Sequence, residues 1–292
     1  MKILVLGCGG QVGHELMGAL GCFASVVGLT RADADLSDHD GLRRKVREIS
    51  PDAVVNAASF NDVDGAERDP DAAMRVNATA VTALGEEARG RFALVHYSTD
   101  FVFDGRASRP YVETDAVGPL GAYGRSKEAG ERALAEMSAP AIILRTAWVY
   151  SLRRKSFVST MLRLAREREV VKVVADQAGN PTFCRDLAQA TALLLYSARR
   201  APLQTFEEAQ GLYHLAGSGV ATRYELAKAV VELARPVEGA RFAEIVPIPS
   251  SEYALPAERP AYAPLDCTKI EERFGVRLPP WRDSLARALA DA

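Results

Sequence analysis

The chain has 292 residues, of which 48% are hydrophobic, and its 36 basic residues nearly balance its 38 acidic residues. This length and composition predict a globular protein with a large core, and the near-neutral charge excludes an electrostatic reason to bind nucleic acid or an anionic membrane. No apolar run reaches the roughly 20 residues that a membrane helix needs, and residues 1–6 are too short for a signal-peptide core, so we expect a cytoplasmic protein.

Short apolar runs alternate with longer amphipathic stretches through the first half of the chain. This alternation is typical of βαβ units and predicts the α/β class, with a Rossmann-type, doubly wound parallel sheet. Ser37 is expected to cap a helix over residues 38–49, and Asp69-Pro70 opens a longer helix that carries Asn77. The predicted strands are Ile3–Leu6, Ser25–Leu29, Ala53–Ala57, Phe92–Tyr97 and Ala141–Arg145.

The pattern changes beyond Tyr150, where strands become shorter and less regular. We expect residues 1–150 to form an NAD(P)-binding domain and residues 151–292 to form a smaller C-terminal substrate-binding lobe, with some elements returning to the first sheet. The later predicted elements are helices over 155–168, 185–199 and 222–234, strands over 170–174 and 212–215, and a proline-rich loop over 247–264.

A glycine-rich turn follows the first predicted strand. Gly7 permits a tight turn, Gly10 permits close approach of the backbone to a ligand, and Gly13 permits close packing of the next helix. This arrangement places a pyrophosphate at a helix N-terminus, with Gln11 and Val12 beside it. The spacing is GxxGxxG, which differs from the GxGxxG of many dehydrogenases.

Thr30 and Arg31 follow the second strand, where many NAD enzymes keep an acid for the ribose 2′-hydroxyl. A guanidinium there can pair with a 2′-phosphate, so we expect NADPH as the cofactor and leave NADH open. The alternative is that Arg31 is a solvated charge beside Asp33 and Asp35. The other residues expected at the cofactor are Asp35, Leu36, Ala57, Ala58, Ser59, Phe60, Asn61 and Tyr97.

Tyr123 and Lys127 are four residues apart in a predicted helix and therefore lie on one face. A nearby ammonium stabilises a phenolate, so we expect Lys127 to lower the pKa of Tyr123 and Tyr123 to act as a general acid. Thr99, at the end of the fourth strand, is expected to hold a substrate carbonyl oxygen against Tyr123. Lys127 is also expected to bind the ribose of the nicotinamide.

The order of glycine turn, threonine, tyrosine and lysine is that of the short-chain dehydrogenase/reductase superfamily, and GxxGxxG resembles its extended branch. Within that branch, the chain closely resembles dTDP-4-dehydrorhamnose reductases over nearly its whole length. The resemblance rests on Gly10–Gly13, Asn56–Ala58, Val63–Asp64, Ala66–Glu67, His96–Gly105, Tyr123–Lys127, Arg145–Tyr150, Asp176–Gln177, Pro181–Thr182, Leu212–Leu215 and Arg259–Pro260.

The resemblance implies NADPH-dependent reduction of the C4 ketone of dTDP-4-dehydro-L-rhamnose to dTDP-L-rhamnose. It implies catalytic roles for Thr99, Tyr123 and Lys127, and contact of Asp100 and Trp148 with the sugar nucleotide. Arg259 is expected either to hold the diphosphate or to cap the 247–264 loop.

The cysteines and histidines are dispersed, so we expect no metal site. The resemblance leaves a homodimer open, but Arg185 stands where some relatives carry an acid. A metal-bridged dimer built on that acid is therefore not expected. Gly65 and Phe60 are further departures from the family pattern, and neither removes a catalytic group.

Two other functions remain open from the sequence. One is a different extended-branch enzyme acting on a nucleotide sugar, such as another reductase, an epimerase or a dehydratase. The second is a non-catalytic regulatory subunit resembling that of methionine adenosyltransferase, although such a subunit has no need of Thr99, Tyr123 and Lys127 together.

Overall fold

The computed structural model describes residues 1–238 and 242–291. Six parallel strands form the central sheet in the order β10-β5-β4-β3-β1-β2, which confirms the predicted Rossmann-type sheet. The elements up to β5 are β1 Lys2–Leu6, α1 Gln11–Gly21, β2 Ser25–Leu29, α2 His39–Ile49, β3 Ala53–Asn56, α3 Val63–Arg68, α4 Pro70–Met74, a π-helical turn Arg75–Thr79, α5 Ala80–Ala88, β4 Ala93–Thr99, a 3-10 turn Asp100–Val102, α6 Ala122–Glu136 and β5 Ala141–Thr146.

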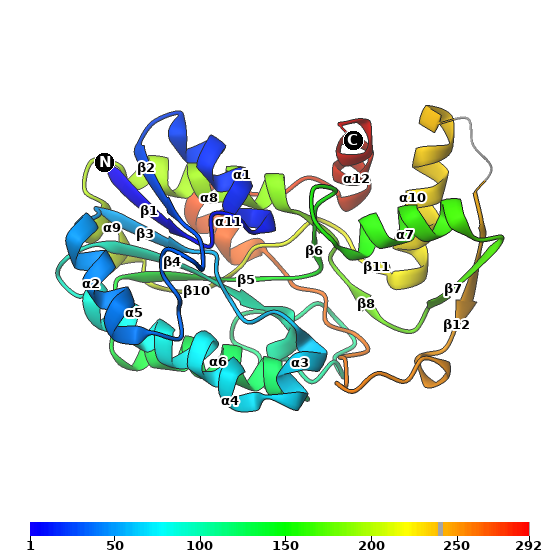
Figure 1. Cartoon of the computed structure of the whole chain (residues 1–292), viewed down its shortest axis with the longest axis horizontal. Helices are drawn as coiled ribbons and strands as arrows, with labels where there is room; N and C mark the ends of the chain where they lie inside the picture. Colours follow the sequence, from blue (N-terminus) through cyan, green and yellow to red (C-terminus); the bar gives the residue numbers. More distant parts are fainter. Residues whose placement is uncertain (239–241, 292) are drawn as a thin grey trace.

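Strands β3 and β5 are buried along their whole length because helices cover both faces of the sheet. Figure 1 shows α1, α8 and α11 on one face and α2, α5 and α6 on the other. The register pairs Leu6 with both Leu29 and Asn56, and Asn56 with His96. The carboxyl ends of β1, β2 and β3 are therefore level, whereas β4 continues past His96 to Thr99, which pairs with Thr146 of β5; the loops that follow all these strands lie at the same edge.

The second half of the chain adds a separate core beside the sheet (Figure 1). Strands β7 and β12 pair in parallel, and α10 packs on α7 and α12 beside them. The remaining elements are β6 Val149–Tyr150, α7 Phe157–Glu167, β7 Val170–Val174, β8 Ala178–Gly179, β9 Thr182–Phe183, α8 Cys184–Ala198, α9 Pro202–Ala209, β10 Gly211–His214, β11 Ala221–Thr222, α10 Arg223–Glu238, β12 Glu244–Ile248, a 3-10 turn Ser250–Glu252, α11 Thr268–Phe274 and α12 Trp281–Ala290.

Parts of the second half lie against the first sheet rather than in the second core. Helix α8 packs along α1, and β10 extends the sheet beside β5. The division of the chain into domains near residue 150 stays a prediction. Within residues 1–238 and 242–291, no helix has both the length and the apolar character needed to cross a bilayer.

Two local predictions are wrong, each for a physical reason, and one is confirmed with an added detail. Asp38 caps α2 by accepting a hydrogen bond from the Gly41 N–H, and Ser37 instead donates its hydroxyl hydrogen to Asp35. The helical run opened by Pro70 carries Asn77 as predicted, and it includes a π-helical turn at that residue, where an extra residue enters the helix. Pro247 lies in β12, which is tolerable because β12 is an edge strand.

Candidate active site

A cavity of about 1730 Å³ opens at the carboxyl ends of the central strands and extends to α7, β7 and β12. This volume exceeds the roughly 300–1,000 Å³ of a typical site for one small ligand, so the cavity has room for a cofactor and a second molecule. Its walls include Leu6 from β1, Thr99 from β4 and Thr146 from β5. Of the residues predicted to bind cofactor or substrate, all except Gly13 line this cavity.

The glycine-rich turn forms one end of the cavity. Gly7 has φ +78°, and its carbonyl accepts a hydrogen bond from the Gly10 N–H at 2.8 Å. A Cβ on Gly13 would lie 2.1 Å from the Gly7 carbonyl oxygen, so α1 packs against the turn more closely than any other residue permits. Gln11 Oε1 is buried without a partner among the described residues. The open helix N-terminus and this cradle fit the pyrophosphate of a dinucleotide.

Charged residues surround the part of the cavity beyond β2. Arg31 has an 86% exposed side chain, and its Nε donates to Asp35 at 3.2 Å. Recognition of a 2′-phosphate by Arg31 stays a prediction. Sequence reasoning missed Arg154, whose guanidinium lies close to Gly9 and lines the same cavity. A loop residue after β6 is placed there only by the tertiary fold.

Thr99 and Tyr123 meet at the centre of the cavity. Thr99 ends β4, and its hydroxyl donates to Asp100 Oδ1 at 3.0 Å. Tyr123 lies in the first turn of α6, with its ring edge-to-face on Phe101 at 5.6 Å. The predicted lowering of the Tyr123 pKa is wrong, because burial raises this pKa to about 12, although a hydrogen bond with Thr99 opposes the shift. The phenol is therefore protonated at neutral pH.

Lys127 lies one turn along α6 from Tyr123 and is 2% exposed. Its Nζ donates to the Tyr97 carbonyl at 2.6 Å and lies 3.3 Å from His96 Nε2. Burial lowers the pKa of Lys127 to about 8, and the nearby Glu131 opposes this shift. The ammonium form therefore predominates at neutral pH and exchanges its proton more readily than an exposed lysine.

Asn77 lies in the π-helical turn, where both polar atoms of its side chain have partners in the protein. Its Oδ1 accepts from the Phe60 N–H at 2.8 Å, and its Nδ2 donates to the Phe60 carbonyl at 2.9 Å and to Ser126 Oγ at 3.0 Å. The side chain thus holds the segment after β3 against α6. The π-helical turn places this amide where it contacts both partners.

The wall of the cavity around Trp148 is assembled from three separate parts of the chain. Trp148 has φ +45°, a conformation that disfavours a bulky residue. A Cβ on Gly179 would lie 2.6 Å from its indole, and the Arg223 guanidinium stacks over the ring, 3.6 Å from the ring centroid. Sequence reasoning missed Arg223 because its contact with Trp148 is not local.

Asp100 is 2% exposed beside this wall. Burial raises its pKa to about 7, opposed by the Thr99 hydrogen bond and the charge of Arg223. Its Oδ2 has no hydrogen-bond partner among the described residues. At neutral pH the buried Asp100 carboxyl group is therefore close to its pKa, and it lies beside the wall that contains Trp148.

The two arginines of this wall differ in how they are bound. Arg259 donates to Asp64 at 2.9 Å and to the Ala257 carbonyl at 2.7 Å, so much of its guanidinium already has partners. None of the described residues accepts a hydrogen bond from the Arg223 guanidinium, and burial lowers its pKa to about 10. Arg223 is therefore the more available donor for a ligand.

The comparisons with known proteins agree with this geometry. A family model described as the RmlD substrate binding domain matches residues 1–292. A curated dTDP-4-dehydrorhamnose reductase of Burkholderia thailandensis is 46% identical over 295 residues, which cover 100% of this chain and 99% of the relative. The chain belongs to the dTDP-4-dehydrorhamnose reductase family. This confirms the resemblance found in the sequence motifs.

Solved structures of the family have the same fold. A dTDP-4-dehydrorhamnose reductase of Clostridium acetobutylicum is 31% identical and superposes with a TM-score of 0.89, covering 99% of each chain. The Bacillus anthracis reductase, solved in complex with NADP, is 28% identical with a TM-score of 0.88, covering 100% of this chain and 99% of that one.

Arg185, a departure from the family pattern, has partners within this chain. Its Nε donates to Glu15 at 3.1 Å, and its Nη1 forms an ion pair with Asp291. Arg185 thus ties α8 to the first helix and the last. Among residues 1–238 and 242–291, no cluster of three or more potential ligands for a metal ion is found.

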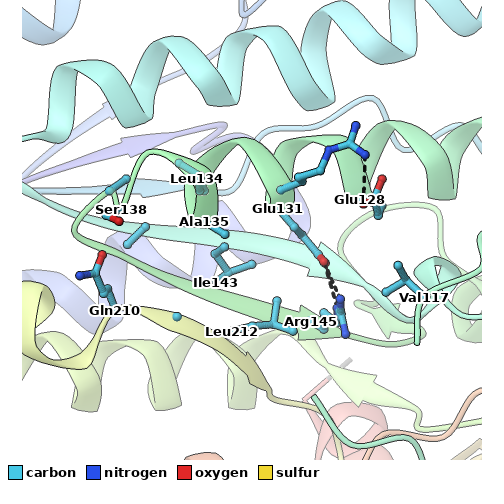
Figure 2. A pocket seen from close by; sticks show the side chains of 14 residues that line it. Val117, Glu128, Glu131, Leu134, Ala135, Ser138, Ile143, Arg145, Gln210 and Leu212 are labelled. Atoms are coloured by element: carbon cyan, nitrogen blue, oxygen red, sulfur yellow. Dashed lines mark hydrogen bonds and ion pairs between the residues drawn. The ribbon is translucent and has the colours of Figure 1, made fainter. Parts of the chain in front are cut away.

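A second, smaller cavity of about 390 Å³ lies between α6 and the strands β5 and β10 (Figure 2). At one end, Glu131 and Arg145 form a buried ion pair with contacts of 2.6 to 3.2 Å. None of the residues predicted to bind cofactor or substrate lines this cavity. The cavity does, however, show that the Glu131 carboxylate, one turn along α6 from Lys127, is directed to Arg145.

Proposed function

We propose that the protein reduces the C4 ketone of dTDP-4-dehydro-L-rhamnose with NADPH, which gives dTDP-L-rhamnose and NADP⁺. Membership of the family makes the protein an oxidoreductase of nucleotide-sugar biosynthesis. The NADP complex of the Bacillus anthracis relative supports the choice of cofactor.

One observation carries the proposal. Thr99, Tyr123 and Lys127 line the same cavity as the glycine-rich turn, in a chain that matches reductases of this family over its full length. A binding module has no need to place a protonated phenol, a hydroxyl and a buried ammonium at one point. This observation favours an enzyme over a regulatory subunit.

In the proposed reaction, NADPH supplies the hydride when bound. Thr99 orients the ketone oxygen, and Tyr123 gives its proton to that oxygen as negative charge develops on it. The high pKa of Tyr123 keeps the phenol protonated until its proton is transferred to the substrate oxygen. Trp148 covers the sugar and excludes water, while Asp100 hydrogen-bonds a sugar hydroxyl.

The test is NADPH oxidation against a panel of dTDP- and UDP-linked 4-ketosugars. We expect the greatest kcat/KM with dTDP-4-dehydro-L-rhamnose and one NADPH consumed per ketone reduced. Turnover of a 4-keto sugar without net NADPH consumption would indicate an epimerase or a dehydratase. Binding of NADPH without turnover of any ketosugar would favour the regulatory subunit.

The cytoplasmic location and a homodimer stay predictions. Fractionation of the source cells tests the first of them. Light scattering of the purified protein tests the second.

A further inference from the structure

Behind Lys127 lies a chain of buried hydrogen bonds that the proposed reaction does not use. The Ala58 N–H donates to Asn56 Oδ1 at 3.2 Å, and Asn56 Nδ2 lies 3.2 Å from His96 Nδ1. His96 Nε2 in turn lies 3.3 Å from Lys127 Nζ. Asn56 and His96 are each 1% exposed, so their donors and acceptors must be matched within the protein.

The backbone end of this chain fixes the direction of each bond. A backbone N–H only donates, so Asn56 turns its oxygen to Ala58 and its NH₂ group to His96. His96 Nδ1 therefore accepts. Burial and the charge of Lys127 hold the pKa of His96 well below its ordinary value, so the ring is neutral and has one proton. That proton lies on Nε2, the nitrogen that faces Lys127.

An ammonium at Lys127 would meet this Nε2–H as donor against donor. An amine at Lys127 accepts the Nε2–H and still donates to the Tyr97 carbonyl, which lies 2.6 Å away. If the His96 proton lay on Nδ1 instead, it would face the Asn56 NH₂ group as donor against donor. The conflict would therefore move to that contact and would not disappear. In either tautomer the protonated lysine loses one hydrogen bond, and only the amine completes the chain.

We propose that His96 is a positioning residue whose Nε2–H favours the amine form of Lys127, so that this side chain exchanges a proton instead of remaining a fixed cation. In the reaction, which rests on the proposed function, a proton from the Lys127 ammonium replaces the one that Tyr123 gives to the substrate oxygen. The resulting amine then accepts the His96 Nε2–H. The preference itself belongs to the free protein.

The charged groups near Lys127 leave this effect of His96 in place. Glu131, one turn along α6, favours the ammonium, but its carboxylate is directed to Arg145 on β5 and paired with it (Figure 2). Tyr123, one turn back, is protonated because of its raised pKa. Asp100, the first residue after β4, accepts a hydrogen bond from the Thr99 hydroxyl.

Asn56→Asp tests the direction of the chain. A carboxylate there accepts from both the Ala58 N–H and His96 Nδ1–H, which turns Nε2 into an acceptor for an ammonium. We expect the Lys127 pKa to rise by about one unit or more. It is measured by NMR on protein with isotopically labelled lysine, assigned through Lys127→Arg. The alkaline limb of kcat/KM should move in the same direction.

His96→Leu separates this effect from the added charge of Asn56→Asp, because it removes the Nε2–H and introduces no carboxylate. It should also raise the Lys127 pKa. Thr191→Val is the matched control. Thr191 lies on α8, and its hydroxyl is 2.6 Å from the hydroxyl of Tyr97, the neighbour of His96 on β4. Removing this contact should leave the Lys127 titration unchanged.

Two results would overturn the proposal: a wild-type Lys127 that titrates like an exposed lysine, or a pKa in His96→Leu equal to or below that of wild type. Because the titration is measured without substrate, it stands apart from the proposed function. A normal Lys127 titration series with no ketosugar reduction would contradict the function alone.

Discussion

The two ends of the large cavity are built in different ways. The cofactor end is built around consecutive residues, 7–13, in the turn after β1 and the first turn of α1. The substrate end brings Trp148, Gly179 and Arg223 together from three segments of the chain. A short motif therefore specifies the first end, whereas the second exists only after the whole chain has folded.

The ends also differ in the energy stored in them. At the cofactor end, glycine takes the one left-handed position, Gly7, at little cost. At the substrate end, Trp148 takes a left-handed conformation without being glycine, and Asp100 and Arg223 have pKa values moved towards neutrality by burial. A left-handed conformation at a residue other than glycine costs roughly 1–3 kcal/mol and persists only where the surrounding structure holds it.

The largest expected effect separates chemistry from binding at both ends. Tyr123→Phe removes the proton donor and retains the ring, so kcat should fall by about 10²-fold or more. Affinity for NADP⁺ and dTDP-L-rhamnose, measured by calorimetry, should stay near that of wild type. Tyr213→Phe is the matched control, because its hydroxyl donates to the Ala209 carbonyl away from the cavity. Half of the wild-type rate in Tyr123→Phe would exclude Tyr123 as the acid.

A single methyl group should damage the cofactor end alone. Gly13→Ala places a Cβ against the Gly7 carbonyl, so we expect a loss of about 1–3 kcal/mol in the free energy of unfolding and weaker NADPH binding. Gly18→Ala, in the same helix with nothing within 4 Å, should instead stabilise the protein by up to about 1 kcal/mol. Chemical denaturation and NADPH titration measure both. Equal stability of the two variants would contradict the close packing.

Asp100→Asn should show that the substrate end lowers stability. The folded pKa of Asp100, about 7, is above its unfolded value, so the folded state binds more protons and wild-type stability falls as pH rises from about 4 to 7. The amide lacks this loss. The variant should therefore be more stable than wild type by roughly 1–3 kcal/mol at pH 8 and should match it near pH 4. A pH-independent difference would refute the assignment.

The smallest effect should fall on the substrate end alone. Arg223→Ala removes the cation stacked on Trp148, an interaction worth roughly 1–2 kcal/mol, so KM for the ketosugar should rise about tenfold. The Kd of NADPH should not change. Arg163→Ala, which removes an exposed pair with Glu167 on α7, is the control and should affect neither. An equal loss for NADPH and ketosugar would show that the two ends are not independent.

The sequence predicted the sheet well because hydrophobic runs and their spacing determine strands locally. Ser25–Leu29 was predicted at its observed bounds, and β10 within one residue at each end. The placement of Tyr123 and Lys127 on one helix was likewise predicted from local sequence alone. The sequence could not predict that burial would raise the pKa of Tyr123, because burial depends on what packs against it.

Residues that act across the fold had no signal in the sequence. Arg223 follows Thr222, which caps α10 as expected, yet its guanidinium lies against an indole 75 positions earlier in the chain (223 − 148). Arg154 and His96 are similar cases. Each is unremarkable by local pattern and gains its role from its neighbours in space.

The return of β10 and α8 to the first sheet affects how the chain folds during its synthesis. Ile3 and Leu16 share a core with Leu187 and Leu195. Residues that are synthesised first are therefore fully buried only after residues of α8 have been synthesised. A nascent chain that ends at β5 therefore has an uncovered helix, α1, and an unpaired edge on its sheet. Until α8 and β10 emerge from the ribosome, that surface is exposed to chaperones and to other nascent chains.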